Sequence, residues 1–154
     1  MELNVIAQDL GNRLGIEIVV SEEGSFGLEV DGMSIVVETI AGTQSVVVSS
    51  LIAQPPPERM EGLYGILLKA NHRFAATAGS TLSLDPESGE VALGRILDLR
   101  AMDGEEFFNA LEGFVNTLET WRETVSEFRA MPPPVESAAD DMPQFGGMNG
   151  FMQV

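Results

Sequence analysis

The stretch from Phe26 to Ile52, FGLEVDGMSIVVETIAGTQSVVVSSLI, decides the fold of this chain. At its start, apolar and polar residues alternate, which is the pattern of a strand with one buried face. Asp31-Gly32 then provides a two-residue hairpin turn, and Gly42 provides a second turn between segments rich in Val and Ile. The sequence therefore predicts a three-stranded antiparallel meander. The expected strands span 26–31, 33–40 and 45–52.

This meander is apolar on both of its faces, although one core can bury only one of them. One face carries six apolar residues: Phe26, Leu28, Ile35, Val37, Val46 and Val48. The opposite face carries Val36, Ile40 and Val47. The pattern does not decide which face is the core. The surplus face must find cover in a second subunit, the C-terminal residues or a partner, and we select the first set as the expected binding surface.

Helices are predicted on both sides of the meander. Upstream, residues 2–14 show helical spacing that ends near Gly15, and Ile16–Val20 is β-branched and strand-like. Downstream, Pro55-Pro56-Pro57 favours the start of a helix over Glu58–Asn71. Gly62 and Gly65 weaken that helix, which indicates either the close approach of another backbone or loose local packing.

A second hairpin and a long helix follow. Strands over 81–84 and 91–99 flank a turn at 85–89. Asp103 and Glu106 form a capping-box pair for the last helix. Its apolar residues repeat at spacings of four and three: Phe107, Leu111, Phe114, Leu118, Trp121, Val125 and Phe128. This stripe is interpreted as facing the sheet, with pairing to a partner helix as the alternative. The fold class is α+β, an antiparallel sheet flanked by helices in the order α-β-β-β-α-β-β-α.

Composition bounds the domain organisation and the partners. The chain has 154 residues, no cysteine, and 24 acidic against 8 basic residues, for a net charge of −16. Residues 1–130 are predicted to form one domain, and 131–154 a flexible tail rich in Pro, Gly and Met. The negative charge disfavours nucleic acid and favours a basic partner. No long apolar run or basic N-terminal flank is present, so a cytoplasmic location is expected, without membrane insertion.

No catalytic, cofactor-binding or metal-binding residue is predicted. His72 is the only histidine, so it has no second histidine with which to build a metal site. Asp85, Glu87 and Glu90 surround a turn but lack the spacing of a calcium-binding EF-hand loop. Gly146–Gly150 lacks the Lys and Ser/Thr of a phosphate-binding loop.

Four segments carry a family resemblance. LYGILLKAN at 63–71 leads into TAGSTLSLD at 77–85, followed by GEVAL at 89–93 and the helix from Phe107 to Trp121. Together they resemble the Tir chaperone family, the effector chaperones of bacterial type III secretion systems, over roughly residues 2–128.

The resemblance implies a non-enzymatic homodimer that binds the N-terminal segment of a secreted effector in extended form. Such a chaperone keeps its effector secretion-competent and delivers it to the export apparatus. The second helix would supply the dimer interface: Gly62, Leu63, Gly65, Ile66 and Lys69. The six apolar residues above would bind the effector, which can also add a strand to a sheet edge. Residues 131–154 depart from the family pattern, and a separate hypothesis is that Phe145–Met152 packs into the client groove or docks on the secretion machinery. The alternatives are an acidic dimeric adaptor or regulatory protein without a secretion role, and an enzyme that depends on His72.

Overall fold

The predicted order of helices and strands is confirmed in a computed structural model that describes residues 2–132. Single turns of 3-10 helix at His72–Phe74 and Leu99–Ala101 are the further elements in this range. The predicted tail from residue 133 onward, with the docking peptide Phe145–Met152, lies outside the described residues. The main elements are α1 (Leu3–Leu14), β1 (Ser25–Val30), β2 (Met33–Thr39), β3 (Ser45–Ala53), α2 (Met60–Ala70), β4 (Thr81–Leu84), β5 (Val91–Asp98) and α3 (Gly104–Ala130).

The five strands form one antiparallel sheet in the order β1-β2-β3-β5-β4. The predicted turn between β1 and β2 is confirmed, because Asp31 and Gly32 both adopt positive φ angles, 49° and 73°. This backbone is that of the hairpin turn whose twist matches the flanking strands. The second hairpin places β5 inside the sheet, beside β3, and leaves the short β4 at the edge.

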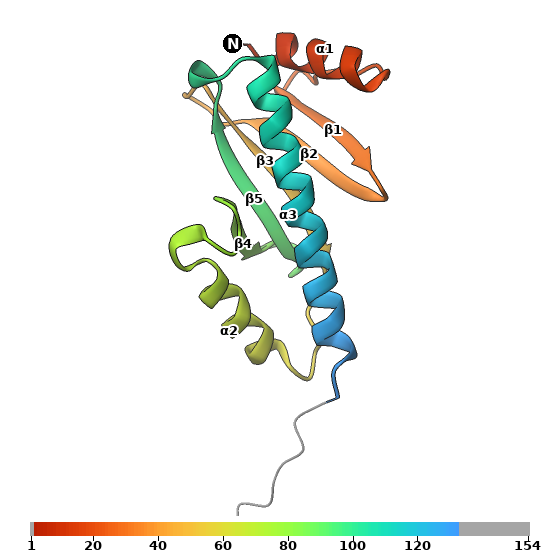
Figure 1. Ribbon diagram of the computed structural model, residues 1–154, viewed down its shortest axis with the longest axis vertical. Coiled ribbons are helices and arrows are strands. Elements are labelled where there is room, and N and C mark those ends of the chain that lie inside the picture. The colour runs from red at the N-terminus through yellow and green to blue at the C-terminus, as the bar shows by residue number, and fades with distance from the viewer. Residues whose placement is uncertain (1, 133–154) are drawn as a thin grey trace, which may run out of the picture.

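Helix α3 lies across one face of the sheet, with α1 near one end and α2 near the other (Figure 1). The predicted capping box is present: the Glu106 amide donates to the Asp103 carboxylate, and the Asp103 amide donates to Glu106, each at 2.9 Å. The apolar stripe of α3 is buried from Phe107 to Val125 within this subunit. The core-facing interpretation of the stripe is therefore confirmed.

Helix α2 begins at Met60, two residues later than predicted, and is tied to the end of α3. The Arg59 guanidinium donates to the carbonyl oxygen of Phe128 at 2.7 Å and lies 4.9 Å from the centre of its ring. A Cβ atom on Gly62 would lie 3.2 Å from that ring. The close approach predicted at Gly62 is therefore to a side chain of the same subunit.

The strand-like interpretation of Ile16–Val20 is wrong, because this segment pairs with no strand. Gly15 ends α1 in the left-handed conformation, and the Ile16 amide then bonds to the Gly11 carbonyl oxygen at 3.0 Å. The segment turns back against α1, so closely that a Cβ on Gly11 would lie 2.7 Å from the Ile16 oxygen. The β propensity of these residues yields to packing against the helix.

Candidate protein-binding surfaces

The six residues selected as the apolar binding surface lie in the core. They are Phe26, Leu28, Ile35, Val37, Val46 and Val48, and each is at most 6% exposed. Their side chains belong to the core cluster that also contains the apolar stripe of α3. This prediction is wrong for the folded subunit, because α3 already covers that face of the sheet. A binding surface must therefore be sought on the opposite face and at the edges.

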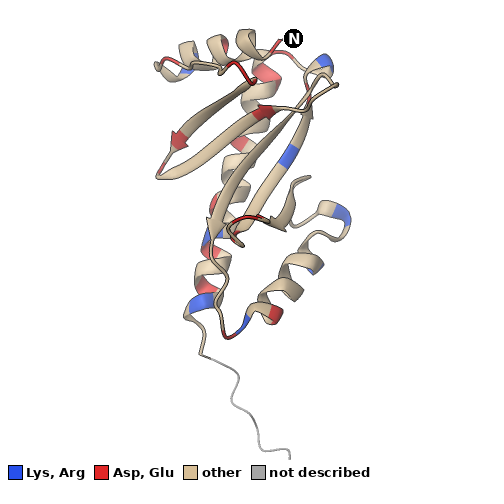
Figure 2. Ribbon diagram, turned by 180° about the vertical axis from the view of Figure 1, so that it is seen from behind, with Lys and Arg blue, Asp and Glu red and all other residues tan. Residues whose placement is uncertain are grey.

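The opposite face, which we call the outer face, is covered by no helix of residues 2–132 (Figure 2). Its residues follow from the strand registers: Ser25, Gly27, Glu29, Ser34, Val36, Glu38, Ser45, Val47, Ser49, Leu51, Thr81, Ser83, Ala92, Gly94, Ile96 and Asp98. Most are small or β-branched, and three are acidic. Ile96 is 68% exposed. A hollow of about 370 Å³ between Val36, Ser49 and Ala92 lies on this face. The small side chains leave room for another polypeptide to approach closely.

The sheet is open at the second half of β5. Pairing with β4 stops at Gly94, whereas β5 continues to Asp98. The amide of Leu99 bonds to Gln44 beside β3, so odd-numbered residues of β5 point their backbone groups toward β3. The N–H and C=O groups of Ile96 therefore point to the side where β4 has ended. These groups are free to pair with an added strand.

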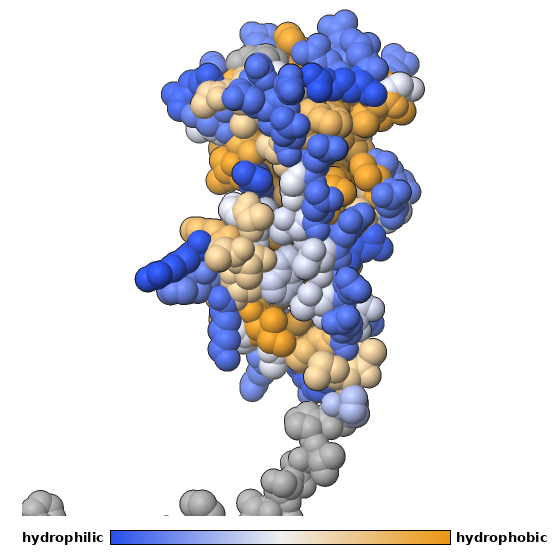
Figure 3. All heavy atoms as spheres, in the orientation of Figure 1, coloured by the Kyte–Doolittle hydropathy of each residue, from blue (hydrophilic) through white to orange (hydrophobic). Residues whose placement is uncertain are grey.

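The other edge of the sheet is β1, whose free side borders an apolar groove beside α3. Ser25 bonds to Ser21 through its backbone, away from β2, so by alternation the backbone groups of Gly27 and Glu29 also point outward. The groove holds about 280 Å³. Its apolar lining is Leu14, Leu28, Val30, Phe108, Leu111 and Val115. In Figure 3, hydrophobic residues gather beside the N-terminal half of α3 and again over α2.

Helix α2 carries a second exposed apolar surface. Leu68 is 71% exposed, Lys69 follows it at the surface, and Ile66 is exposed on another side of the helix. Nothing lies within 4 Å of the position that a Cβ on Gly65 would take. Leu63, in contrast, is completely buried in its own subunit and is unavailable to a partner, so its predicted place in a dimer interface is wrong.

The connection after α2 is strained and held in place. Arg73, Phe74 and Ala78 adopt positive φ angles of 58°, 56° and 48°, a conformation that costs non-glycine residues free energy. The Trp121 indole donates to the Ala76 carbonyl oxygen at 3.1 Å and holds this connection to α3. As a result, the half-exposed ring of Phe74 lies beside Val47 and Ile96, where the outer face meets the open end of β5.

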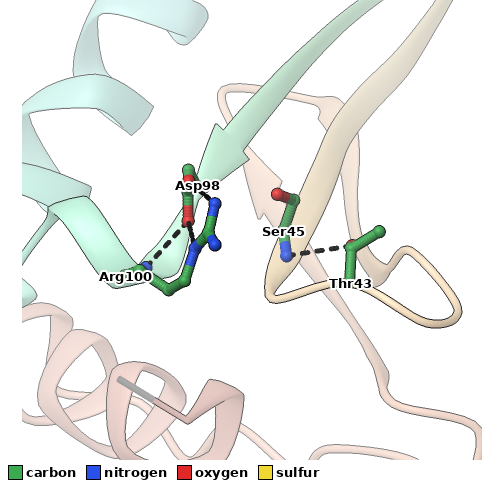
Figure 4. Close-up of polar contacts among 4 residues, drawn as sticks. All are labelled: Thr43, Ser45, Asp98 and Arg100. Carbon is green, nitrogen blue, oxygen red and sulfur yellow. Dashed lines mark hydrogen bonds and ion pairs between the residues drawn. The ribbon is translucent and has the colours of Figure 1, made fainter.

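Polar contacts fix the start of β3 and the end of β5, beside the outer face of the sheet (Figure 4). Asp98 accepts hydrogen bonds from the Arg100 side chain at 2.6 and 3.0 Å and from its backbone amide at 3.0 Å. The Arg100 side chain therefore holds the pKa of Asp98 at about 2. Thr43 accepts from the Ser45 amide at the start of β3, at 3.1 Å. In the β4–β5 turn, the hydroxyl of Ser88 lowers the pKa of Asp85.

Residues 2–132 do not assemble a metal-binding centre. No three His, Asp or Glu side chains of this range are grouped to hold a metal ion. His72 is exposed at the end of α2, in the strained connection. No helix in the described range is long and apolar enough to cross a bilayer. What the geometry offers instead is a protein-binding scaffold: one covered sheet face, one uncovered face and two open edges.

Comparison with known proteins agrees with that class. Residues 6–122 match the model of the Tir chaperone protein (CesT) family, and the chain belongs to this family. A comparison with curated proteins gave no match.

Solved structures share the fold. A chain of the ExsC–ExsE complex superposes with a TM-score of 0.70 at 17% identity, covering 81% of this chain and 97% of that one. A chain of the HopA1–SchA chaperone–effector complex gives 0.63 at 16% identity, covering 78% and 92%. YbjN from E. coli, a putative transcription regulator, gives 0.60 at 18% identity, covering 84% and 93%.

Proposed function

We propose that this protein is a type III secretion chaperone that binds the N-terminal segment of one or more effectors in extended form. It acts in the bacterial cytoplasm without turnover, keeps its client soluble and competent for export, and brings it to the export apparatus. Residues 1–130 form the chaperone domain. Membership of the Tir chaperone family supports this proposal.

The observation that carries the proposal is the open sheet of an acidic protein. The outer face has no helix over it, and unpaired backbone groups lie at Gly27 and Glu29 on one edge and at Ile96 on the other. An extended segment pairs with such an edge through its backbone, while its alternate side chains enter apolar hollows. Binding of this kind needs an unfolded client and only moderate sequence specificity.

A homodimer formed through α2 is part of the proposal. A contact between two identical subunits brings like charges together, which is costly for a chain of net charge −16. The segment 58–79, which contains α2, has two acidic and three basic residues and is the exception to this charge. Its half-buried Gly65 and its exposed Ile66, Leu68 and Lys69 provide a surface on which a second copy can pack.

Light scattering tests the dimer with two matched variants. Leu68→Glu places a charge on the α2 surface and is expected to give a folded monomer. Val19→Glu makes the same change at a residue that is equally exposed but lies beside α1, and it is expected to leave the dimer intact. A wild-type chain that is monomeric at micromolar concentration contradicts the dimer.

Client binding is tested by co-expression with the first 100 or so residues of a candidate effector. We expect a stable complex with two chaperone subunits per client, in which rapid hydrogen exchange shows that the client lacks a core of its own. Loss of effector secretion in a strain without this chain is the expected consequence in the cell. Binding only to folded proteins contradicts the proposal.

A second candidate is a dimeric adaptor or regulatory protein without a secretion role. The shared fold with YbjN favours it, because the same scaffold occurs in a protein described as a putative transcription regulator. Unchanged effector secretion together with altered transcript levels in the deletion strain would support this candidate.

A further inference from the structure

The groove between β1 and α3 has an acidic rim around an apolar floor. Three carboxylates are among the residues that line it: Asp31, Glu112 and Glu119. None of them forms an ion pair within residues 2–132, where the Arg100–Asp98 pair is the salt bridge present. Glu29 belongs to the same strand but faces the outer side of the sheet, away from the groove. The rim of the groove thus carries three carboxylates that form no ion pair among the described residues.

Arg13, a basic residue near the floor of the groove, already contacts an aromatic ring. The guanidinium of Arg13 lies 5.3 Å from the centre of the Phe108 ring, over its face. A cation at that position is stabilised by the ring. The remaining floor, formed by Leu28, Leu111 and Val115, is open to an apolar side chain.

An added strand fits this arrangement. A segment paired with Gly27 and Glu29 at the β1 edge has every second side chain on the α3 side of the sheet. One or two of these side chains would enter the groove, whose volume of about 280 Å³ accommodates a leucine or phenylalanine. Residues before and after them would reach the level of the carboxylates.

We propose that this groove selects client segments in which a bulky apolar residue is flanked on both sides by lysine or arginine. The inference rests on the proposed function and specifies the chemistry of the segment that the β1 edge takes. Opposite charges at the rim favour encounter with the client and discriminate against acidic segments. The apolar side chain supplies the affinity, because it leaves water when it enters the groove.

The experiment uses the full-length chain and three fluorescent 12-residue peptides with a central alternation of leucine and threonine. Two lysines, two glutamines or two glutamates flank this centre on each side. Anisotropy is expected to show binding in the order lysine, glutamine, glutamate, with about a tenfold difference between the first two at low salt. The lysine advantage is expected to shrink at 0.5 M NaCl, because salt screens exposed charges.

Two triple variants locate the effect. The rim variant D31N/E112Q/E119Q is expected to bind the lysine and glutamine peptides equally. Asparagine at position 31 retains the turn, because it tolerates a positive φ. The control E58Q/E61Q/E87Q removes the same charge from exposed residues that do not line the groove, and is expected to keep the preference. Val115→Trp fills the groove and is expected to abolish binding of all three peptides while the circular dichroism spectrum is unchanged.

Equal binding of the lysine and glutamate peptides overturns the inference, as does an unchanged preference in the rim variant. Failure of the lysine peptide to bind at 1 mM also overturns it. None of these results affects the proposed function, which stands or falls with the two-to-one client complex and the secretion assay. A client that binds equally well to the wild type and to Val115→Trp shows that the chaperone uses its other surfaces.

Discussion

Both faces of the sheet contain valine, but valine packs into the core on one face and faces outward on the other. In β3, Val46 and Val48 are completely buried under α3, whereas Val47, between them, faces outward opposite Ile96. The core face carries bulky side chains in every strand and meets the matching stripe of α3. The outer face mixes a few Val and Ile side chains with Ser, Gly, Ala and the acidic residues Glu29, Glu38 and Asp98, and no helix of residues 2–132 covers it. Side-chain size therefore distinguishes the face that packs against α3 from the face that another polypeptide can approach.

The largest expected effect is on the covered face. Phe114 is 1% exposed at the centre of the α3 stripe, and Phe114→Ala is expected to destabilise the subunit by about 3–5 kcal/mol, because it leaves a cavity between helix and sheet. Urea unfolding followed by circular dichroism measures this loss. Glu123→Ala, an exposed position on the same helix, is the control and is expected to stay within about 0.5 kcal/mol of wild type. A small loss at Phe114 would contradict the assignment of this face as the core.

Substitutions of two neighbouring valines in β3 compare the two faces of the sheet directly. Val48→Ala is expected to cost about 1.5–3 kcal/mol, from the lost burial of two carbon atoms and the resulting cavity, and Val47→Ala less than about 1 kcal/mol. Client affinity is expected to show the reverse order, with a measurable loss for Val47→Ala and none for Val48→Ala at temperatures where both variants are folded. Titration calorimetry with a co-purified effector segment measures the second quantity. Equal effects of the two variants on both quantities would remove the distinction between the faces.

The smallest expected effect concerns the polar contact at the end of β5. The pKa of Asp98 falls from an ordinary value of 3.8 to about 2 in the folded protein, so ionised Asp98 stabilises the fold above about pH 4. This contribution disappears as the pH falls through 2. Asp98→Asn is therefore expected to melt slightly below wild type at pH 7, and the two melting temperatures should converge between pH 4 and pH 2. A constant difference across that range would contradict the role of the Arg100 contact.

The features that could be predicted from the sequence depend on interactions between residues that are close together in the chain. The capping box at Asp103 and Glu106 and the hairpin turn at Asp31 and Gly32 depend on residues within a few positions of each other, and both are confirmed. The assignment of the faces failed because both are apolar, and only the position of α3 decides between them. Ser49, Ala92 and Gly94 carried an overlooked signal, since small residues in alternating register mark the face that no helix fills.

Other features depended on tertiary structure that no local pattern records. The open end of β5 arises because β4 has four residues and β5 has eight, which leaves Ile96 without a neighbouring strand on the β4 side. Leu63 and Leu68 lie on the same helical stripe in the sequence, yet the first is buried and the second exposed. The strained connection at Arg73 and Phe74 is held at Ala76 by Trp121, which is far away in the chain.

The unpaired sheet edges have a cost when no client is present. Edges of this kind recruit copies of the same protein into growing aggregates, and many soluble proteins shield them with bulges or covering loops. Here the mutual repulsion of molecules with a net charge of −16 takes the place of such shielding. A solution of the chaperone without its client should therefore form a precipitate when it is acidified toward the isoelectric point near pH 4.1. A solution of the client-loaded complex should remain clear.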